Sequence, residues 1–294
     1  MPSDLREIAI RFEKVTKVFD HAGGSAPSSS NTAVLDDVTF DIPRNAITVL
    51  VGSSGCGKTT LLRTINRMVD PTSGRVLVEG EDVAGRDPVS LRRGIGYVMQ
   101  NGGLLPHRTV VDNVATVPRL NGVPRKQARA RAMELLEVVG LEAGVSKRYP
   151  AQLSGGQQQR VGVARALAAE SGILLMDEPF AAVDPIVRRE LQAEVLRLQR
   201  ELGRTIVFVT HDISEAFHLG DQVVLLQKGG HIAQRGTPEE FIATPANDFV
   251  REFIDADSRH LRVEGRRVVD ARGRVAGVLD NATSNHPVHK QPGR

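Results

Sequence analysis

The sequence is poor in the residues and segments that several classes of protein require. It contains no Trp and only two Tyr, which argues against a surface that stacks nucleic-acid bases. No apolar run approaches the roughly 20 residues of a membrane-spanning helix, and the first residues lack the apolar core of a secretion signal. The one cysteine, Cys56, has no partner for an internal disulfide, which fits a reducing compartment. We therefore expect a protein that is made and kept in the cytoplasm.

The charge of the chain is small and unevenly distributed. The net charge is +3, but residues 259–294 hold eight Lys and Arg against three Asp and Glu, a balance of +5, which leaves −2 for residues 1–258. The basic character therefore belongs to the tail, and we expect no nucleic-acid partner for the main body. The last residues, 281–294, are polar, and we expect them to be disordered.

Apolar runs alternate with helical patterns along the chain. Continuous apolar runs are typical of parallel strands that are covered on both faces, and they occupy residues 47–51, 173–176 and 206–209. Apolar residues at helical spacing occupy residues 59–68, 124–140 and 188–202. This order predicts an α/β fold with a largely parallel core sheet, into which a helical subdomain is inserted at about residues 100–165.

A glycine-rich loop follows the first apolar run. It fits the pattern G-x-x-x-x-G-K-[ST] between a strand and a helix, the context in which such a loop binds phosphate. Its backbone N–H groups would surround phosphate oxygens, Lys58 would reach the β- and γ-phosphates, and Thr59 would coordinate Mg²⁺. A chance glycine turn is the alternative. The predicted nucleotide-binding residues here are Gly52, Ser53, Ser54, Gly55, Cys56, Gly57, Lys58, Thr59 and Thr60.

Two acidic residues end the second apolar run. An acid at the carboxyl end of a buried parallel strand points into the ligand crevice of such folds. We predict that Asp177 helps to hold Mg²⁺ and that Glu178 orients and deprotonates the water that attacks the γ-phosphate. A solvated acid pair at a strand end is the alternative. Pro179 and Phe180 after the pair, together with the phosphate loop before it, favour the catalytic interpretation.

A second anion site is predicted at Ser154, Gly155 and Gly156. Ser154 opens a helix, and Gln157 follows at the spacing of a capping box. Capping alone does not need two glycines, which also permit a phosphate to approach the backbone closely. Gln100 and His211 each follow a predicted strand. A His in such a position is usually structural, but here it lies among residues that suit γ-phosphate chemistry.

In this order and at these spacings, the motifs resemble those of the ATP-binding-cassette (ABC) ATPases over residues 7–245. The resemblance implies a P-loop fold with an N-terminal antiparallel β part, and ATP and Mg²⁺ as cofactors. It identifies Gln100 as the Q-loop residue and a further Mg²⁺ ligand, residues 153–157 as the signature, Asp184 as part of the D-loop, and His211 as the switch histidine. Phe19 occupies the place of the aromatic that stacks on adenine.

The family further implies a head-to-tail dimer, either of two copies or with a second ABC ATPase. Each ATP would lie between one phosphate loop and the partner's signature. In its transporters the groove beside the Q-loop receives a helix of a membrane permease, which here must be a separate protein. Such a subunit is attached to the cytoplasmic face of the membrane, and an extracytoplasmic binding protein would deliver the solute to the permease.

A narrower resemblance concerns the solute. Residues 87–100, 105–110 and 153–160 are similar to the ATPases of glycine betaine, choline and proline importers. Many of those relatives end in paired CBS regulatory modules. Here residues 246–258 suggest a helical extension, and residues 259–294 are too short for such a pair and hold at most one hairpin resembling a module's last part.

Three functions compete at this stage. The first is the ATPase subunit of an osmoprotectant importer, and the second is import of another small solute, such as an amino acid or another quaternary amine. The third is a soluble ABC ATPase that acts on DNA or ribosomes. Proteins of the third class generally carry two cassettes or a long coiled-coil insertion, and the sequence shows neither.

Overall fold

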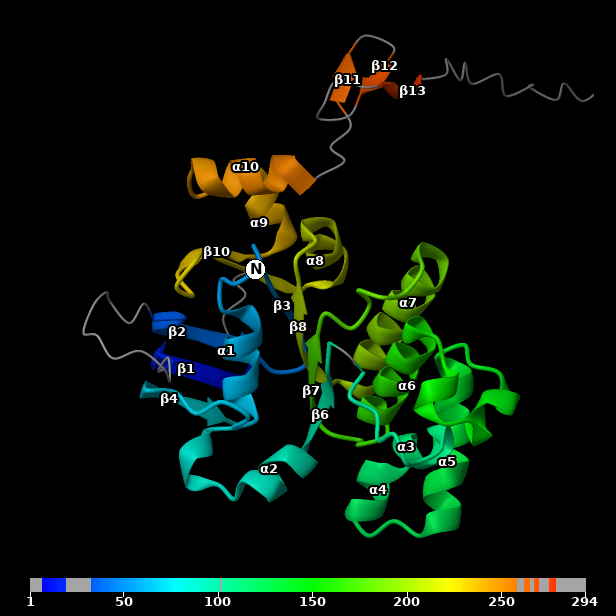
Figure 1. Cartoon of the computed structure of the whole chain (residues 1–294). Coiled ribbons are helices and arrows are strands. Elements are labelled where there is room, and N and C mark those ends of the chain that lie inside the picture. Colours follow the sequence, from blue (N-terminus) through cyan, green and yellow to red (C-terminus); the bar gives the residue numbers. More distant parts are fainter. Residues whose placement is uncertain are drawn as a thin grey trace, which may run out of the picture.

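The computed structural model describes residues 7–19, 33–100 and 102–257, and the backbone of three short strands beyond them. Figure 1 shows two sheets on the left and centre, with helix α1 (Lys58–Ile65) between them and further helices on the right. The predicted loop at residues 21–32 and the predicted disordered end at 281–294 lie outside the described residues.

The central sheet has six strands in the order β10-β9-β3-β8-β7-β6. Its strands pair in parallel except β10, which is antiparallel to β9. Every residue of β3, β7 and β8 is buried, as the continuous apolar runs predicted. The strands are β3 (Ile47–Gly52), β6 (Ile95–Val98), β7 (Ile173–Asp177), β8 (Thr205–Thr210), β9 (Gln222–Leu226) and β10 (Ile232–Gly236).

A second sheet confirms the expected antiparallel β part, with strand order β2-β1-β4-β5. Phe12 and Phe40 stack on its inner face with ring centroids 4.7 Å apart. That face, helix α1 and one face of the central sheet share one hydrophobic core. The strands are β1 (Ile8–Lys17), β2 (Leu35–Pro43), β4 (Ser73–Val78) and β5 (Glu81–Asp82).

The other face of the central sheet is covered by helices. Alternate residues of β3 point to the two faces, so Leu50 joins the core around α1 while Val49 and Val51 join a larger core that includes α5 to α8. The helices are α2 (Pro88–Arg93), α3 (Val110–Val114), α4 (Thr116–Leu120), α5 (Arg125–Val138), α6 (Gly155–Leu167), α7 (Pro185–Leu202), α8 (Ile213–Leu219), α9 (Pro238–Ala243) and α10 (Asp248–Asp257).

Two helix boundaries differ by three residues from the sequence prediction. Helix α1 ends at Ile65 instead of near residue 68, because Arg67 adopts a positive φ of 55° that ends the helical turn. Helix α7 begins at Pro185, three residues before the predicted start, because the Asp184 side chain accepts from the N–H groups of Ile186 and Val187. Proline fits the first helical position, where its missing N–H costs no bond.

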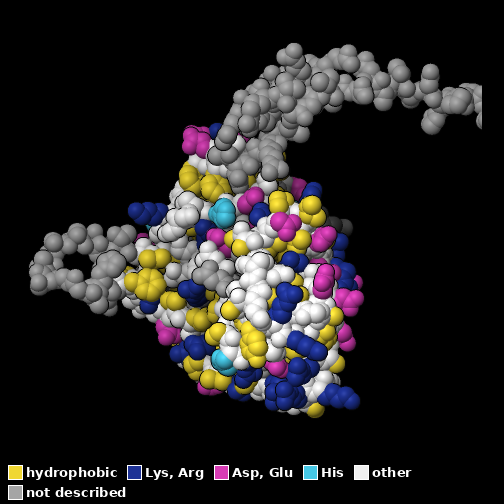
Figure 2. All heavy atoms as spheres, turned by 45° about the vertical axis from the view of Figure 1, so that its right-hand side comes forward, with side chains coloured by type: hydrophobic (Ala, Val, Ile, Leu, Met, Phe, Trp, Pro, Cys, Tyr) yellow, Lys and Arg dark blue, Asp and Glu magenta, His cyan; other side chains and the backbone are white. Residues whose placement is uncertain are grey.

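Near the C-terminal end, β11 (Arg262–Glu264), β12 (Arg267–Val269) and β13 (Val275–Val278) form an antiparallel sheet. The hairpin anticipated about residue 273 corresponds to β12 and β13, and β11 adds a third strand. Among the described residues, we find no helix with the length and hydropathy needed to cross a bilayer. Figure 2 shows acidic and basic side chains interspersed, with Lys and Arg gathered toward the lower end of the face in view.

Candidate functional site

The phosphate loop joins β3 to α1 and depends on its glycines. Gly57 has a φ of 103°, and a Cβ there would lie 2.7 Å from the Val34 carbonyl oxygen, so only glycine fits. Lys58 Nζ donates to the carbonyl oxygens of Gly52 at 2.7 Å and Ser53 at 3.0 Å, and its side chain is almost fully buried. The ammonium group is thus folded over the loop, within reach of any phosphate that the loop would hold.

Asp177 lies at the carboxyl end of β7 and touches the start of α1. Thr59 Oγ1 donates to Asp177 Oδ1 at 2.7 Å. The other carboxylate oxygen, Oδ2, lies 3.4 Å from the Tyr97 hydroxyl and 3.5 Å from the Arg63 guanidinium. The hydrogen bond to Tyr97 raises the pKa of Arg63, and burial raises the pKa of Tyr97. The fully buried Asp177 carboxylate is therefore fixed on both sides.

A hydroxyl and a carboxylate at this place suit Mg²⁺, which prefers a few protein oxygens and completes its shell with phosphate oxygens and water. No group of three or more His, Cys, Asp or Glu that could hold a metal by itself occurs in the described part of the chain. The donors present therefore fit a magnesium ion that arrives with a nucleotide, and they do not fit a metal caged by protein alone.

Glu178 follows directly and lies between the side chains of Gln100 and His211. Gln100 Nε2 donates to Glu178 Oε2 at 3.2 Å, and His211 Nδ1 lies 3.6 Å from Glu178 Oε1. The Glu178 backbone has a positive φ of 46°, which is unusual for a residue with a side chain. The carboxyl ends of four neighbouring strands of the central sheet, β3, β8, β7 and β6, thus bring Lys58, Asp177, Glu178, Gln100 and His211 to one edge.

The signature residues form a separate helix end. Ser154 caps α6 with the predicted capping box, its Oγ accepting from Gln157 N and its own N donating to Gln157 Oε1. Within the described residues, the hydrogen bonds recorded for Ser154 are with its own helix. A Cβ on Gly155 would meet nothing within 4 Å, whereas one on Gly156 would lie 3.1 Å from the Ala182 carbonyl oxygen. Glycine is therefore needed at position 156 because α6 approaches the backbone of this same chain closely there.

The remaining predicted residues surround these two clusters. Asp184 caps α7, a structural task that its D-loop assignment did not include. Thr60 is half-buried in the first turn of α1. Phe19 is 44% exposed, with Lys17 Nζ 5.0 Å from its ring centroid. A partly exposed aromatic ring with a cation over it is compatible with adenine stacking, which stays a prediction.

Four residues that sequence reasoning missed hold the site in place. Arg63 and Tyr97 fix Asp177, as described above. Gln159 connects α6 to the loop after β7, and Arg165 donates to the carbonyl oxygens of Gly102 and Gly103 at 2.8 and 2.7 Å. For Gln159, the one available signal was a polar residue on the buried side of a predicted helix.

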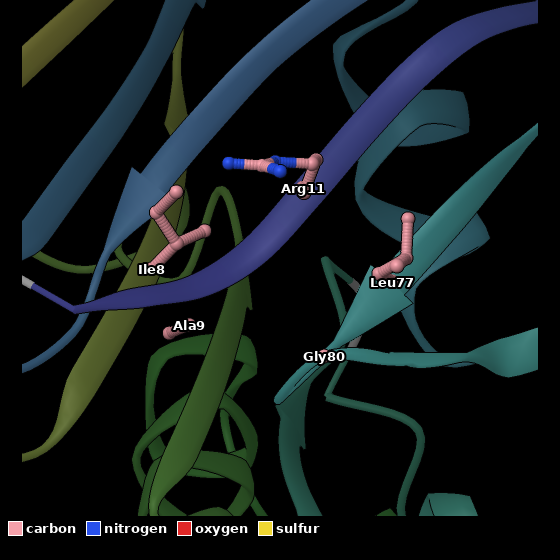
Figure 3. A pocket seen from close by; sticks show the side chains of 5 residues that line it. All are labelled: Ile8, Ala9, Arg11, Leu77 and Gly80. Carbon is pink, nitrogen blue, oxygen red and sulfur yellow. The ribbon is translucent and has the colours of Figure 1, made fainter.

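A small hollow lies elsewhere, between β1 and β4. Its volume is about 170 Å³, and Figure 3 shows the side chains that line it. Its one charged residue, Arg11, already pairs with Asp41 at 2.8 Å. The rest of its lining is apolar or glycine, and we assign the hollow no role.

The comparison with protein families agrees with this geometry. Residues 35–181 match the family model described as ABC transporter. The chain belongs to the ABC transporter family. It is 49% identical over 245 residues to a glycine betaine/carnitine/choline transport ATP-binding protein of Bacillus subtilis, covering 83% of this chain and 62% of that one. It is 45% identical to a glycine betaine uptake system ATP-binding protein of Escherichia coli, covering 88% and 81%.

The fold is that of an ABC ATPase cassette. A dimeric ATP-binding cassette solved in a post-hydrolysis state with ADP and Pi superposes with a TM-score of 0.71 at 31% identity, covering 78% of this chain and 98% of that chain. The P-loop fold inferred from the sequence is confirmed. The chain spans only about three fifths of the length of the Bacillus relative.

Proposed function

We propose that this chain is the ATP-binding and ATP-hydrolysing subunit of an ABC importer that takes up an osmoprotectant such as glycine betaine, choline or proline. The observation that carries the proposal is the Glu178 carboxylate, held between Gln100 and His211 beside the Thr59–Asp177 pair. Phosphoryl transfer to water needs a phosphate cradle, a cation site and a group that orients the water. All three are adjacent here.

The chemistry of each residue follows from its present contacts. Lys58 would exchange its two carbonyl partners for phosphate oxygens, since a charge-assisted bond to phosphate is stronger than one to a carbonyl. Glu178 would accept a proton from the attacking water, and His211 would contact the γ-phosphate. Thr59, Asp177 and Gln100 would hold Mg²⁺, which when bound neutralises charge on the phosphates.

A dimer would complete the site. Ser154 and Gly155 lie at the open N-terminus of α6, where free backbone N–H groups and the helix dipole favour an anion. Within the described residues, Ser154 bonds to its own helix and not to the cluster around Lys58 and Glu178. We therefore propose that it serves the ATP of a partner subunit in a head-to-tail dimer. Asp184, in the loop before α7, would lie at the same interface.

We propose that residues 1–245 form the nucleotide-binding unit, with the helices of residues 100–165 as its signature-bearing part. Residues 246–258 would be a helical extension, and residues 259–294 a short basic tail that holds at most a truncated CBS-like hairpin. The chain would lie on the cytoplasmic face of the membrane, bound to a separate permease that an extracytoplasmic binding protein supplies.

The proposed solute rests on relatives. The Bacillus and Escherichia proteins are named for transport of glycine betaine, and the first also for carnitine and choline. Solute specificity in such systems lies in the permease and the binding protein, so the geometry of the ATPase does not select among quaternary amines, amino acids and related solutes.

Co-purification from native membranes in mild detergent tests the transport role. We expect a multi-span permease and a quaternary-amine binding protein among the partners identified by mass spectrometry. A permease found with a binding protein for another class of solute would overturn the osmoprotectant assignment. Recovery with ribosomes or DNA and without a permease would overturn transport and leave the ATPase proposal standing.

A further inference from the structure

Gln159 connects the signature helix to the catalytic loop. It lies on the buried side of α6, with 2% of its surface exposed. Its Nε2 donates to the Glu178 carbonyl oxygen at 2.9 Å, and its Oε1 accepts from Ala182 N at 3.0 Å. A primary amide has a donor end and an acceptor end, and here each end finds its complement. The side-chain orientation is therefore fixed from both sides.

The bond to Glu178 acts on an unusual piece of backbone. Glu178 has a φ of 46°, a conformation that residues with a Cβ avoid and that persists where the surroundings hold it. Three hydrogen bonds do so: Glu178 N donates to the Val209 carbonyl oxygen at 3.1 Å, and its carbonyl oxygen accepts from Gln159 Nε2 at 2.9 Å and from Ala181 N at 3.3 Å. One support comes from the central sheet, one from the loop itself, and the shorter bond to the carbonyl oxygen from α6.

The same helix also contacts the loop at its first turn. Gly156 approaches the Ala182 carbonyl oxygen so closely that a Cβ would lie 3.1 Å from it. Gly156 and Gln159 are on one face of α6, and both touch the loop that runs from Glu178 to Ala182. A displacement of the N-terminus of α6, where Ser154 lies, would therefore displace the backbone that sets the direction of the Glu178 side chain.

We propose that Gln159 is a positioning residue for Glu178 and that it transmits the state of the Ser154 end of α6 to that carboxylate. The inference rests on the proposed function. In the proposed dimer, Ser154 and Glu178 of one chain serve two different ATP molecules. Gln159 then makes hydrolysis at one site depend on occupation of the other, and this coupling appears as a cooperative dependence of turnover on ATP concentration.

The substitution Gln159→Glu tests the donor end of the amide. It keeps the size and the acceptor for Ala182 N, but when ionised it cannot donate to the Glu178 carbonyl oxygen and repels it. For the purified full chain we expect kcat to fall about tenfold or more, with the affinity for a fluorescent ATP analogue changed less than about twofold, since only transition-state positioning is lost. The Hill coefficient should fall toward 1.

A pH series separates positioning from simple packing. In acid the introduced carboxyl is protonated and donates again, so the ratio of the variant's kcat to that of the wild type should rise as pH falls. Gln159→Met, which has no donor, should show no such recovery. Gln199→Glu is the matched control, because Gln199 Nε2 also donates to a backbone carbonyl oxygen, that of Asn45, at 2.8 Å on the exposed side of α7.

The possible outcomes have different meanings. If Gln159→Glu behaves like Gln199→Glu while the wild-type chain hydrolyses ATP, the inference is wrong and the proposed function stands. If kcat falls and does not recover in acid, Gln159 acts through packing and the positioning role is wrong. If kcat recovers in acid but the Hill coefficient is unchanged, the proposed link between the two ATP sites is wrong.

Inactivity of the wild-type chain would overturn the proposed ATPase itself. In that case amide hydrogen exchange at Ala182 still tests whether Gln159 holds the loop after β7. The inference requires the Ala182 amide to exchange faster in Gln159→Met than in Gln199→Glu.

Discussion

The Tyr97 hydroxyl lies 3.4 Å from Asp177 Oδ2 and accepts a hydrogen bond from Arg63 Nε at 3.2 Å. Asp177 is fully buried, and its other oxygen is occupied by Thr59. A buried carboxylate is costly unless hydrogen bonds and an opposite charge compensate it. Tyr97 and Arg63 supply both, so strand β6 and helix α1 together fix the proposed magnesium ligand at the end of β7.

Tyr97→Phe should therefore destabilise the protein. It removes one hydrogen bond to Asp177 and the acceptor for Arg63, and we expect a loss of about 1 kcal/mol in the free energy of unfolding. That loss corresponds to a fall of about 2–4 °C in Tm. The second tyrosine gives a matched control, since Tyr149 is exposed at the surface and Tyr149→Phe should leave Tm unchanged. Equal Tm values for the two variants would contradict a supporting role for Tyr97.

Glu178→Gln should separate nucleotide binding from hydrolysis. The amide still accepts from Gln100, but it cannot take a proton from water, and removing a general base costs roughly 10²–10⁴-fold in turnover. We expect ATP affinity to be retained and a closed dimer to accumulate with ATP in size-exclusion chromatography. Glu252→Gln, on the exposed side of α10, is the control. Full turnover in Glu178→Gln would remove Glu178 from the mechanism.

Lys58→Ala should weaken nucleotide binding itself. The ammonium group would exchange two carbonyl partners for phosphate oxygens. Loss of such a charge-assisted bond should raise the Kd for ATP about 10- to 100-fold. Titration with a fluorescent ATP analogue measures the effect, with Lys126→Ala on the exposed side of α5 as the control. Unchanged affinity would contradict the phosphate-loop assignment.

Much of this site followed from the sequence for a simple reason. Parallel strands end at one edge of the sheet, so residues that follow β3, β6, β7 and β8 must meet there, and Lys58, Gln100, Glu178 and His211 do. The supports were not predictable, because Gln159 and Arg165 act through backbone atoms that carry no sequence signature. Gly156 was assigned to phosphate approach, whereas within this chain its lack of a Cβ serves contact with Ala182.

Glu215 gives a prediction about pH. Burial raises its pKa above the ordinary 4.5, with Asp212 adding to the rise and hydrogen bonds from Thr210 and Gln192 opposing it. The folded chain thus holds this proton more tightly than the unfolded chain. The stabilisation that comes from this tighter binding is complete below the pKa that Glu215 has in the unfolded chain. It is lost as pH rises through the pKa that Glu215 has in the folded chain.

Glu215→Gln removes this dependence and keeps an oxygen that accepts from Gln192. The stability of the variant relative to the wild type should therefore rise between pH 4.5 and neutral pH, as measured by urea unfolding across that range. Glu239, whose carboxyl is exposed and has a lowered pKa, offers the opposite case, so Glu239→Gln should show no such rise. A pH-independent difference for Glu215→Gln would mean that its carboxyl is not perturbed by folding.

Arg165 holds the backbone that follows Gln100. Its two terminal nitrogens donate to the carbonyl oxygens of Gly102 and Gly103, and burial lowers the pKa of its guanidinium. Gly102 also packs against α6, where a Cβ on Gly162 would lie 3.3 Å from the Gly102 carbonyl oxygen. A planar fork is needed to reach two carbonyls at once, and a lysine ammonium cannot reproduce it.

Arg165→Lys should therefore loosen the segment that carries Gln100. We expect faster amide hydrogen exchange over residues 102–105 without a change in the central strands β3 and β8, because the loss is local. Arg197→Lys is the control, since Arg197 pairs with Glu194 and Glu201 on the exposed side of α7. Unaltered exchange at residues 102–105 would show that glycine packing alone holds the segment, and faster exchange throughout the core would show that Arg165 supports the whole fold instead.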